Sequence, residues 1–174
     1  DIWSDQHTAY KLYKRDNIDL VNKGKKINIL SAISLDGLIM PRDKIVSSER
    51  LHGYSMEYIR GKSIFELNLN KKQLIDLFRK ISSYLKYYHK YGIVLADFNL
   101  SNILFTSKSD FHFVDVDSAR IYDLPHDSIP AITYNFLTSH GCDFSKVAID
   151  ENFDNLSLIL NFLYVLFEGH PIYN

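Results

Sequence analysis

Residues 91–104 have the sequence YGIVLADFNLSNIL, and residues 114–118 have the sequence VDVDS. In the first segment a short apolar run ends at Asp97, and Asn102 follows five positions later. In the second segment two aspartates follow another apolar run. Carboxylate and amide oxygens at the ends of short strands are hard ligands of the kind that Mg²⁺ and phosphate-transfer sites use. The two segments therefore predict a site for phosphoryl chemistry.

Transfer of a phosphoryl group from a nucleotide needs three kinds of side chain. A carboxylate orients or deprotonates the acceptor hydroxyl, and we expect Asp97 to fill this role. Oxygen ligands bind Mg²⁺, and Asn102 and Asp115 are the candidates because a small hairpin would present them from its two ends. A cation binds the nucleotide phosphates. Lys11, on a strand in the first third of the chain, is the candidate, and Lys14 is the alternative.

Two helices and a hairpin are predicted around these segments. Apolar residues recur at helical spacing from Lys71, and this pattern ends near Gly92. The apolar runs 102–105 and 111–114, joined by a polar turn, predict the hairpin. Residues 156–167 are almost wholly apolar, which predicts a buried helix too short to cross a membrane.

The first third of the chain is expected to be rich in strands. Residues 8–14 alternate and contain several aromatic residues, and residues 53–59 predict another strand. Ile45 and Val46 are expected in a partner strand, and a further strand is expected before Pro41. This part of the chain thus predicts a small β-rich unit.

Two segments carry weaker signals. Residues 16–34 are weakly helical, and Lys23, Lys25 and Lys26 within them are expected on a solvated face. Residues 120–150 contain two prolines and no clear period, which predicts a long irregular segment. Long loops inside compact domains are usually functional or mobile.

Together these segments resemble the protein-kinase-like fold, in its bacterial and phosphotransferase-like members as well as its eukaryotic ones. Residues 91–104 look like the catalytic loop of that family, whose Asp and Asn also stand five positions apart. Asp115 falls where the family has its Mg²⁺-binding Asp, and residues 9–11 resemble the strand with the phosphate-anchoring Lys. Residues 56–59 resemble the hinge between lobes.

The resemblance extends to the central helix of the family's larger lobe. Residues 154–158 resemble the start of that helix, and residues 168–171 resemble its usual Gly-x-Pro ending. Asp154 is expected either to brace the catalytic loop or to cap the helix, and one residue can do both. The motifs follow the family's order from about Thr8 to Pro171.

The resemblance implies an α+β, two-lobed kinase-like fold that is truncated at both ends. Residues 1–59 would form part of the small β-rich lobe and end in the hinge. Residues 60–174 would form part of the mainly helical lobe, without its last helices. The implied segments of that lobe are a catalytic loop at 95–102, a metal-binding loop at 115–118 and a central helix at 154–168.

The resemblance also implies ATP and Mg²⁺ as ligands. Catalytic roles would fall on Asp97, Asn99 and Lys11. Backbone groups of Glu57 and Ile59 would bind the adenine edge, with Met56 as the gatekeeper. The implied ATP contacts are Lys11, Met56, Glu57, Ile59, Asn102 and Asp115, and the implied metal ligands are Asn102, Asp115 and Asp117.

The chain departs from the family's pattern at several positions, and three of these departures concern Lys11 and the metal-binding segment. No glycine precedes Gly24, so the phosphate-covering Gly-rich loop is not found in this sequence. No glutamate precedes Glu49, so the acidic partner of Lys11 is missing or replaced, with Asp19 as the candidate. Asp117 stands in place of the Gly of the Asp-Phe-Gly motif, as a further metal ligand or as a turn cap.

Three functions fit this pattern. The first is an ATP- and Mg²⁺-dependent phosphotransferase, most simply a Ser/Thr protein-kinase-like enzyme acting on a hydroxyl. The second is a pseudokinase that binds a nucleotide or a protein as a regulatory module, which the missing glycines and glutamate favour. The third is a small-molecule kinase of the aminoglycoside or choline phosphotransferase type.

Composition limits the partners. The 174 residues are 46% hydrophobic and 24% charged, with a formal net charge of −1. No overall field attracts the chain to nucleic acid or an anionic membrane, so neither is expected as a partner. One cysteine and no secretory pattern predict a cytoplasmic protein. A partner chain or a second copy is expected to cover the apolar central helix.

Overall fold

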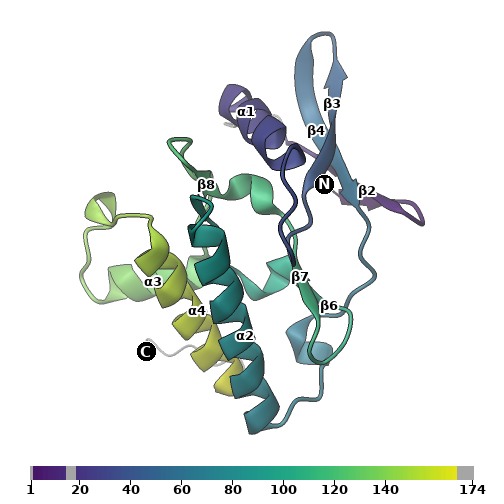
Figure 1. Ribbon diagram of the computed structural model, residues 1–174. Helices are drawn as coiled ribbons and strands as arrows, with labels where there is room; N and C mark the ends of the chain where they lie inside the picture. Colours follow the sequence, from purple (N-terminus) through teal and green to yellow (C-terminus); the bar gives the residue numbers. More distant parts are fainter. Residues whose placement is uncertain (1, 15–18, 168–174) are drawn as a thin grey trace. The chain divides into compact units, whose positions relative to one another are not determined.

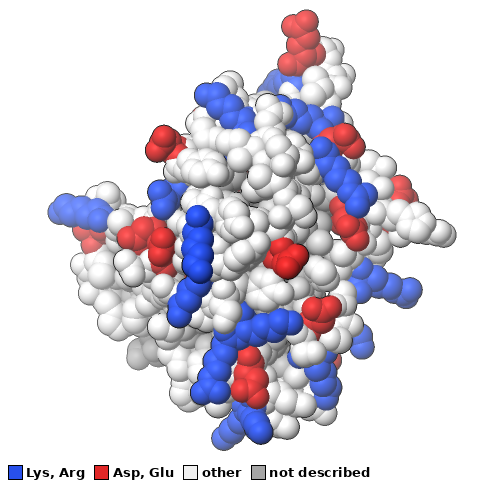
Figure 2. Space-filling model, viewed as in Figure 1, with Lys and Arg blue, Asp and Glu red and all other residues white. Residues whose placement is uncertain are grey.

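The chain is an α+β protein, and the computed structural model describes residues 2–14 and 19–167. On the face drawn in Figure 2, basic and acidic side chains are interspersed and neither sign forms one continuous patch. The chain divides into two compact units. The first contains residues 1–62 and 104–117, and the second contains residues 63–103 and 118–174.

A four-stranded antiparallel sheet is the centre of the first unit (Figure 1). Its strands are β1 (Ile2–Ser4), β2 (Thr8–Leu12), β3 (Pro41–Ser47) and β4 (Arg50–Glu57), in the order β1-β2-β4-β3. The strands predicted at 8–14 and 53–59 are therefore confirmed as β2 and β4. In their register Lys11 lies opposite Tyr54.

The strand expected before Pro41 is wrong. Strand β3 begins at Pro41, and Leu38 ahead of it forms only an isolated bridge to Phe113. A proline can be the first residue of an edge strand because its missing N–H is not needed by the ladder. The partner strand predicted around Ile45 and Val46 is confirmed within β3.

Helix α1 (Leu20–Ser31) packs against β3 and β4 in the first unit (Figure 1). Asp19 caps its N-terminus by accepting hydrogen bonds from the N–H groups of Val21 and Asn22. The core of the unit lies between the helix and the sheet. One cluster of buried residues there contains Ala9, Ile27, Ile39, Tyr54 and Met56.

Gly53 permits the close approach of β2 and β4. A Cβ atom built at this position would lie 1.9 Å from the main-chain oxygen of Lys11. No side chain fits there without moving one strand, so glycine at 53 keeps β2, and Lys11 with it, in place.

The predicted hairpin is present as β6 (Ile103–Phe105) and β7 (Phe111–Phe113). Lys62 and Phe105 exchange two backbone hydrogen bonds, each 2.9 Å long. The Ile39 N–H donates to the Phe113 oxygen at 2.9 Å. These bonds attach the hairpin to the rest of the first unit, and β7 leads directly to Asp115.

Three α-helices lie in the described part of the second unit. They are α2 (Lys71–His89), α3 (Ala131–Ser139) and α4 (Glu151–Leu166), and α4 contacts the other two. Phe78 on α2 and Phe162 on α4 pack edge to face, with ring centres 5.1 Å apart. The helix predicted from Lys71 is confirmed, and the chain leaves it through Gly92, whose φ is +70°.

Residues 120–150 are more regular than expected. Strand β8 (Arg120–Ile121) pairs with β5 (Ile93–Val94), and α3 follows Pro130. Thr133 is the one buried residue of α3. This helix therefore lacks the apolar stripe by which a period is recognised.

The central helix begins one turn earlier than expected. Asp150 caps α4 by accepting hydrogen bonds from the N–H groups of Asn152 and Phe153. The predicted start at Asp154 was wrong because that residue lies inside the helix. The last residue of the predicted span 154–168 and the 168–171 motif lie outside the described residues.

Several large apolar side chains of the second unit face solvent. On α4 the exposed fraction of Ile159 is 54%, and the exposed fraction of Phe167, the residue after α4, is 52%.

None of the helices within the described ranges combines the length and apolar character needed to cross a membrane.

Candidate functional site

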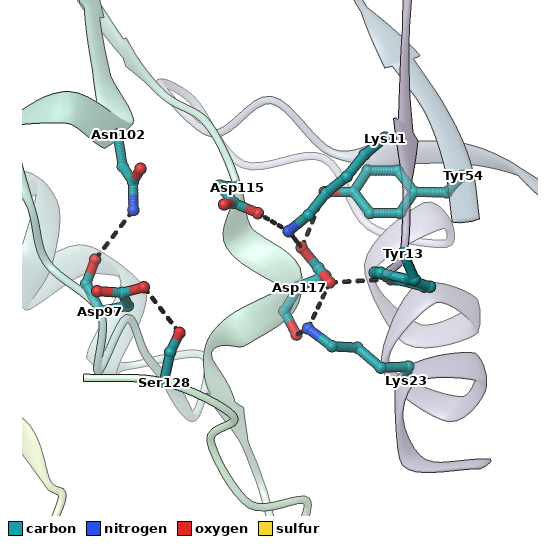
Figure 3. Close-up of polar contacts among 9 residues, drawn as sticks. All are labelled: Lys11, Tyr13, Lys23, Tyr54, Asp97, Asn102, Asp115, Asp117 and Ser128. Carbon is teal, nitrogen blue, oxygen red and sulfur yellow. Dashed lines mark hydrogen bonds and ion pairs between the residues drawn. The ribbon is translucent and has the colours of Figure 1, made fainter. Parts of the chain in front are cut away.

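Lys11 lies between two aspartates of the first unit (Figure 3). Its Nζ atom forms ion pairs with Asp115 and with Asp117, the latter at 2.7 Å. Burial acts to lower the pKa of Lys11, but the charges of Asp117 and Asp115 outweigh it and raise that pKa. The ammonium group is therefore held in its charged form.

Asp117 is fully buried and accepts hydrogen bonds from four side chains. Its Oδ1 atom accepts from Lys11 at 2.7 Å and from Tyr54 at 2.9 Å. Its Oδ2 atom accepts from Tyr13 at 2.9 Å and from Lys23 at 2.5 Å. We call these five residues the Asp117 cluster.

The Asp117 cluster compensates a buried charge with opposite charges. Burial acts to raise the pKa of Asp117, but Lys11 and Lys23 outweigh it and hold the pKa well below its ordinary value. Burial raises the pKa of the Tyr54 hydroxyl, and the negative charge of Asp117 adds to the shift. Tyr54 is thus a neutral hydrogen-bond donor to the carboxylate.

We predicted Asp117 as a metal ligand or a turn cap. Its side chain has no exposed surface, and each of its oxygens already accepts two hydrogen bonds. A carboxylate satisfied in this way has little capacity left for a metal ion. The structure therefore favours a positioning role for Asp117 over metal binding.

Asp115 differs from Asp117 in its exposure. Its side chain is 29% exposed, so it can be reached from solvent. Burial raises the pKa of Asp115, although the charge of Lys11 opposes the shift. Its backbone φ of +65° lies in the left-handed region, which Asp adopts more readily than most residues.

The lysines of α1 correct a prediction. Lys23 and Lys26 were expected on a solvated face, but their exposed fractions are 4% and 0%. Lys23 also donates to the main-chain oxygen of Asp117 at 3.1 Å. The prediction was wrong because it used charge alone. A long lysine side chain can cross a core to reach a buried carboxylate.

Asp19 was the expected acidic partner of Lys11, and this was wrong. The Asp19 carboxylate caps α1 instead. The partners of Lys11 come from the segment that follows β7, about a hundred residues further along the chain.

In the second unit a buried carboxylate holds the loop at residues 95–102. Asp154 of α4 accepts hydrogen bonds from the N–H groups of Leu95 and Ala96, both at 2.9 Å. His89 of α2 contacts the same carboxylate at 2.9 Å. Of the two roles predicted for Asp154, the structure shows the brace. Sequence reasoning missed His89, because nothing in the local pattern links it to α4.

Asp97 follows the braced residues directly. Its Oδ2 atom accepts a hydrogen bond from the Ser128 hydroxyl at 2.7 Å (Figure 3). Ala96 before it has a φ of +59°, a conformation that costs an alanine about 1–2 kcal/mol. The hydrogen bonds that the N–H groups of Leu95 and Ala96 donate to Asp154 offset this strain, and local strain of this kind is typical of functional loops. Ser128 was not predicted, since it lies in the segment expected to be irregular.

The two asparagines of the loop have different local roles. The Asn99 side chain caps a short turn by accepting from the Ser101 N–H at 3.0 Å. The Nδ2 atom of Asn102 donates to the main-chain oxygen of Asp97 at 3.3 Å. This bond uses the nitrogen of the Asn102 amide and leaves its oxygen as a potential ligand.

Asn99 also lines a cavity within the second unit. The cavity has a volume of about 390 Å³, and residues from the loop, α3 and α4 surround it. Its polar lining includes Asn99, Ser101, Asn135 and Asn161, and its aromatic lining includes Phe65 and Tyr164.

The predicted hinge residues end β4 or follow it. Met56 is 4% exposed and belongs to the core of the first unit. Glu57 is the last residue of β4 and pairs with exposed Arg42, while Ile59 packs against the core from outside the strand. The adenine contacts assigned to these residues stay predictions.

No group of three or more His, Cys, Asp or Glu side chains positioned for a metal occurs in residues 2–14 and 19–167. A Mg²⁺ ion bound with nucleotide phosphates does not require such a group, because it commonly uses one or two protein oxygens together with phosphate and water. The assignment of Asn102 and Asp115 as Mg²⁺ ligands stays a prediction.

Comparisons with known proteins give a partial similarity. The chain is 27% identical over 123 residues to NUAK family SNF1-like kinase 2 of Rattus norvegicus, a match covering 66% of this chain and 19% of that kinase. It is 28% identical over 119 residues to NUAK family SNF1-like kinase 1 of Mus musculus, covering 62% of this chain and 17% of that kinase. The similarity is to kinases.

The chain matches about a fifth of the length of these curated relatives. No protein-family model matches the chain. The comparisons thus indicate a distant kinase-like relationship, which agrees with the α+β fold and with the resemblance of the loop at 95–102.

Proposed function

We propose that this protein is a phosphotransferase of the protein-kinase type, which transfers the γ-phosphoryl group of ATP to a hydroxyl. The partial similarity to two kinases and the order of Lys11, Asp97, Asn102 and Asp115 along the chain support it. The proposal requires these four residues to act on one nucleotide.

The hydrogen bond from Ser128 to Asp97 is the observation that carries the proposal. It is a bond between a carboxylate and an aliphatic hydroxyl, which is the interaction that an acceptor hydroxyl needs before transfer. Asp97 would orient the acceptor and take its proton as the oxygen attacks phosphorus. The brace from Asp154 would fix Asp97 in position.

The nucleotide would contact Mg²⁺, a lysine, the end of β4 and the residues that follow it. Asn102 and Asp115 would hold Mg²⁺, which neutralises negative charge on the phosphates when bound. Lys11 would donate to phosphate oxygens, and backbone groups of Glu57 and Ile59 would hydrogen-bond the adenine edge beside Met56. Asn99 is assigned to the acceptor side, because it lies two residues after Asp97 and lines the cavity.

Serine or threonine of a protein is the preferred acceptor, in line with the protein-kinase-like motifs at residues 91–104 and 114–118. A small-molecule hydroxyl is the other acceptor to test. Purified protein would be incubated with radiolabelled ATP and Mg²⁺, with protein acceptors, with aminoglycosides and choline, and alone. Label appearing only in a small molecule would change the acceptor class and keep the reaction type.

Asp97→Asn tests the assigned chemistry. Loss of a proton-accepting carboxylate is expected to lower the transfer rate by about 10²- to 10⁴-fold while MgATP binding stays within about twofold. Asp123→Asn, an exposed aspartate of the same unit, is the matched control. Wild-type protein that binds MgATP but transfers no phosphate would instead be a nucleotide-binding pseudokinase.

A partner covering α4 is also part of the proposal. Ile159 and Phe167 expose apolar surface that a second copy or another chain would bury. Sedimentation equilibrium tests for the second copy. A monomer that binds no hydrophobic dye would contradict the idea.

A further inference from the structure

The acidic partner of Lys11 does not come from α1. Residues 20–31 contain no aspartate or glutamate, and the buried side chain that α1 directs to the Asp117 cluster is a lysine. The helix thus contributes a positive charge, whereas Lys11 on β2 needs a negative one. The negative charge comes from the segment after β7.

Asp115 and Asp117 both pair with Lys11, and burial separates their roles. The Asp115 side chain is 29% exposed and can exchange Lys11 for a ligand that arrives from solvent. The Asp117 side chain is 0% exposed and contacts Lys11 from inside the unit. Only Asp117 can keep its bond to Lys11 when Asp115 turns to another cation.

The second oxygen of Asp117 explains how the carboxylate is fixed. Lys23 donates to Oδ2 and to the main-chain oxygen of the same residue, and Tyr13 adds a third bond on that side. Tyr54 shares Oδ1 with Lys11. With Asp115 included, the charges of Lys11 and Lys23 balance those of the two aspartates. Asp117 can therefore be buried and still present one oxygen to Lys11.

We infer that Asp117 is the positioning residue for Lys11, and that Lys23 of α1 holds Asp117 in place. This inference rests on the proposed function for the role of Lys11 at the nucleotide phosphates. It assigns to Asp117 the pairing with Lys11 that the sequence predicted for Asp19. It also links α1 to Lys11 through one shared carboxylate.

Pulsed lysine acetylation, read by mass spectrometry, tests the pairing without nucleotide. Lys11 is expected to react at least about 10-fold more slowly than exposed Lys25 in the wild type. Asp117→Asn should raise the Lys11 rate at least about fivefold and leave Lys25 unchanged. Fully buried Lys26 reports unfolding, because its rate rises only if the unit opens.

A binding experiment tests whether Asp117 acts through Lys11. In a background that keeps Lys11, Asp117→Asn is expected to weaken MgATP binding at least about 10-fold. In a Lys11→Met background it is expected to weaken binding less than about twofold. Non-additivity of this kind identifies residues that act as one unit. A merely structural role would weaken binding equally in both backgrounds.

The double variant Lys23→Met/Asp117→Asn restores charge balance if the single variant does not fold. It should keep fast acetylation of Lys11 and weak MgATP binding, whereas Lys25→Met, on the same helix, should change neither. Fast acetylation of Lys11 in the wild type, or equal weakening in both backgrounds, would overturn the inference. Absence of MgATP binding by the wild type would refute the proposed function, and the acetylation rates would still decide the pairing.

Discussion

Asp117 in the first unit and Asp154 in the second are both fully buried carboxylates, but different groups compensate them. Asp117 is held by side chains, two of which are lysines. Asp154 is held by two backbone N–H groups and by His89. The first arrangement depends on residue types from several elements, whereas the second depends mainly on the path of the backbone.

This difference has a consequence for stability. A buried ion network is costly when one member is removed, because the remaining charges stay buried without compensation. Backbone donors carry only partial charge, so loss of their acceptor leaves unsatisfied polar groups at a smaller cost. The two carboxylates therefore offer a direct comparison of ionic and backbone compensation in one chain.

The largest effect is expected from Asp117→Ala. Lys11 and Lys23 would lose a shared counter-ion, and we expect the free energy of unfolding to fall by about 3–5 kcal/mol. Urea unfolding followed by circular dichroism measures it. A loss below about 1 kcal/mol would mean that solvent reaches the lysines. It would contradict the larger cost expected for ionic compensation at Asp117 than for backbone compensation at Asp154.

Asp154→Asn should have a smaller effect. The amide keeps one acceptor oxygen but turns its NH₂ group toward a backbone N–H or His89, which costs about 1–3 kcal/mol. Asp150→Asn is the matched control, because Asn caps a helix about as well as Asp and should change stability by a few tenths of a kcal/mol. Equal effects of the two substitutions would contradict the brace.

Acid should separate the wild type from Asp117→Asn. The pKa of Asp117 is held below its ordinary value of about 4 in the folded state, so its contribution is present above that pH and lost as the pH falls further. The wild type should lose up to about 1.4 kcal/mol more per pH unit than the variant between about pH 4 and 2. Parallel stability curves from urea unfolding would refute this.

The smallest effect is expected from Tyr54→Phe. The substitution removes one hydrogen bond to a buried carboxylate and keeps the ring, so the expected cost is about 1–2 kcal/mol. Tyr10→Phe, on β2 and 37% exposed, should cost less than about 0.5 kcal/mol. Thermal unfolding of the two variants measures this difference. Equal melting temperatures would mean that the hydrogen bond from Tyr54 to Asp117 does not contribute to stability.

Local pattern predicted the elements whose signals are periodic. Helix α2 has an apolar stripe from Lys71 and ends before Gly92, and the hairpin of β6 and β7 has two apolar runs around a polar turn. Helix α3 has no such stripe, since it buries only Thr133, and it was missed for that reason. The sequence predicts a strand that ends before Pro41, because sequence alone does not tell an edge strand, which can begin at proline, from a central one.

The sequence by itself determined the α+β class, the loop around Asp97 and Asn102, and the presence of acids after β7, because residue type and short spacing carry that information. Tertiary structure alone decided what each charged group faces. Lys23 is buried, and Asp19 caps α1. Lys11, Tyr54 and Lys23 all contact Asp117. Such contacts join residues up to 106 positions apart. Their stability depends on burial and geometry, which no local pattern of residues encodes.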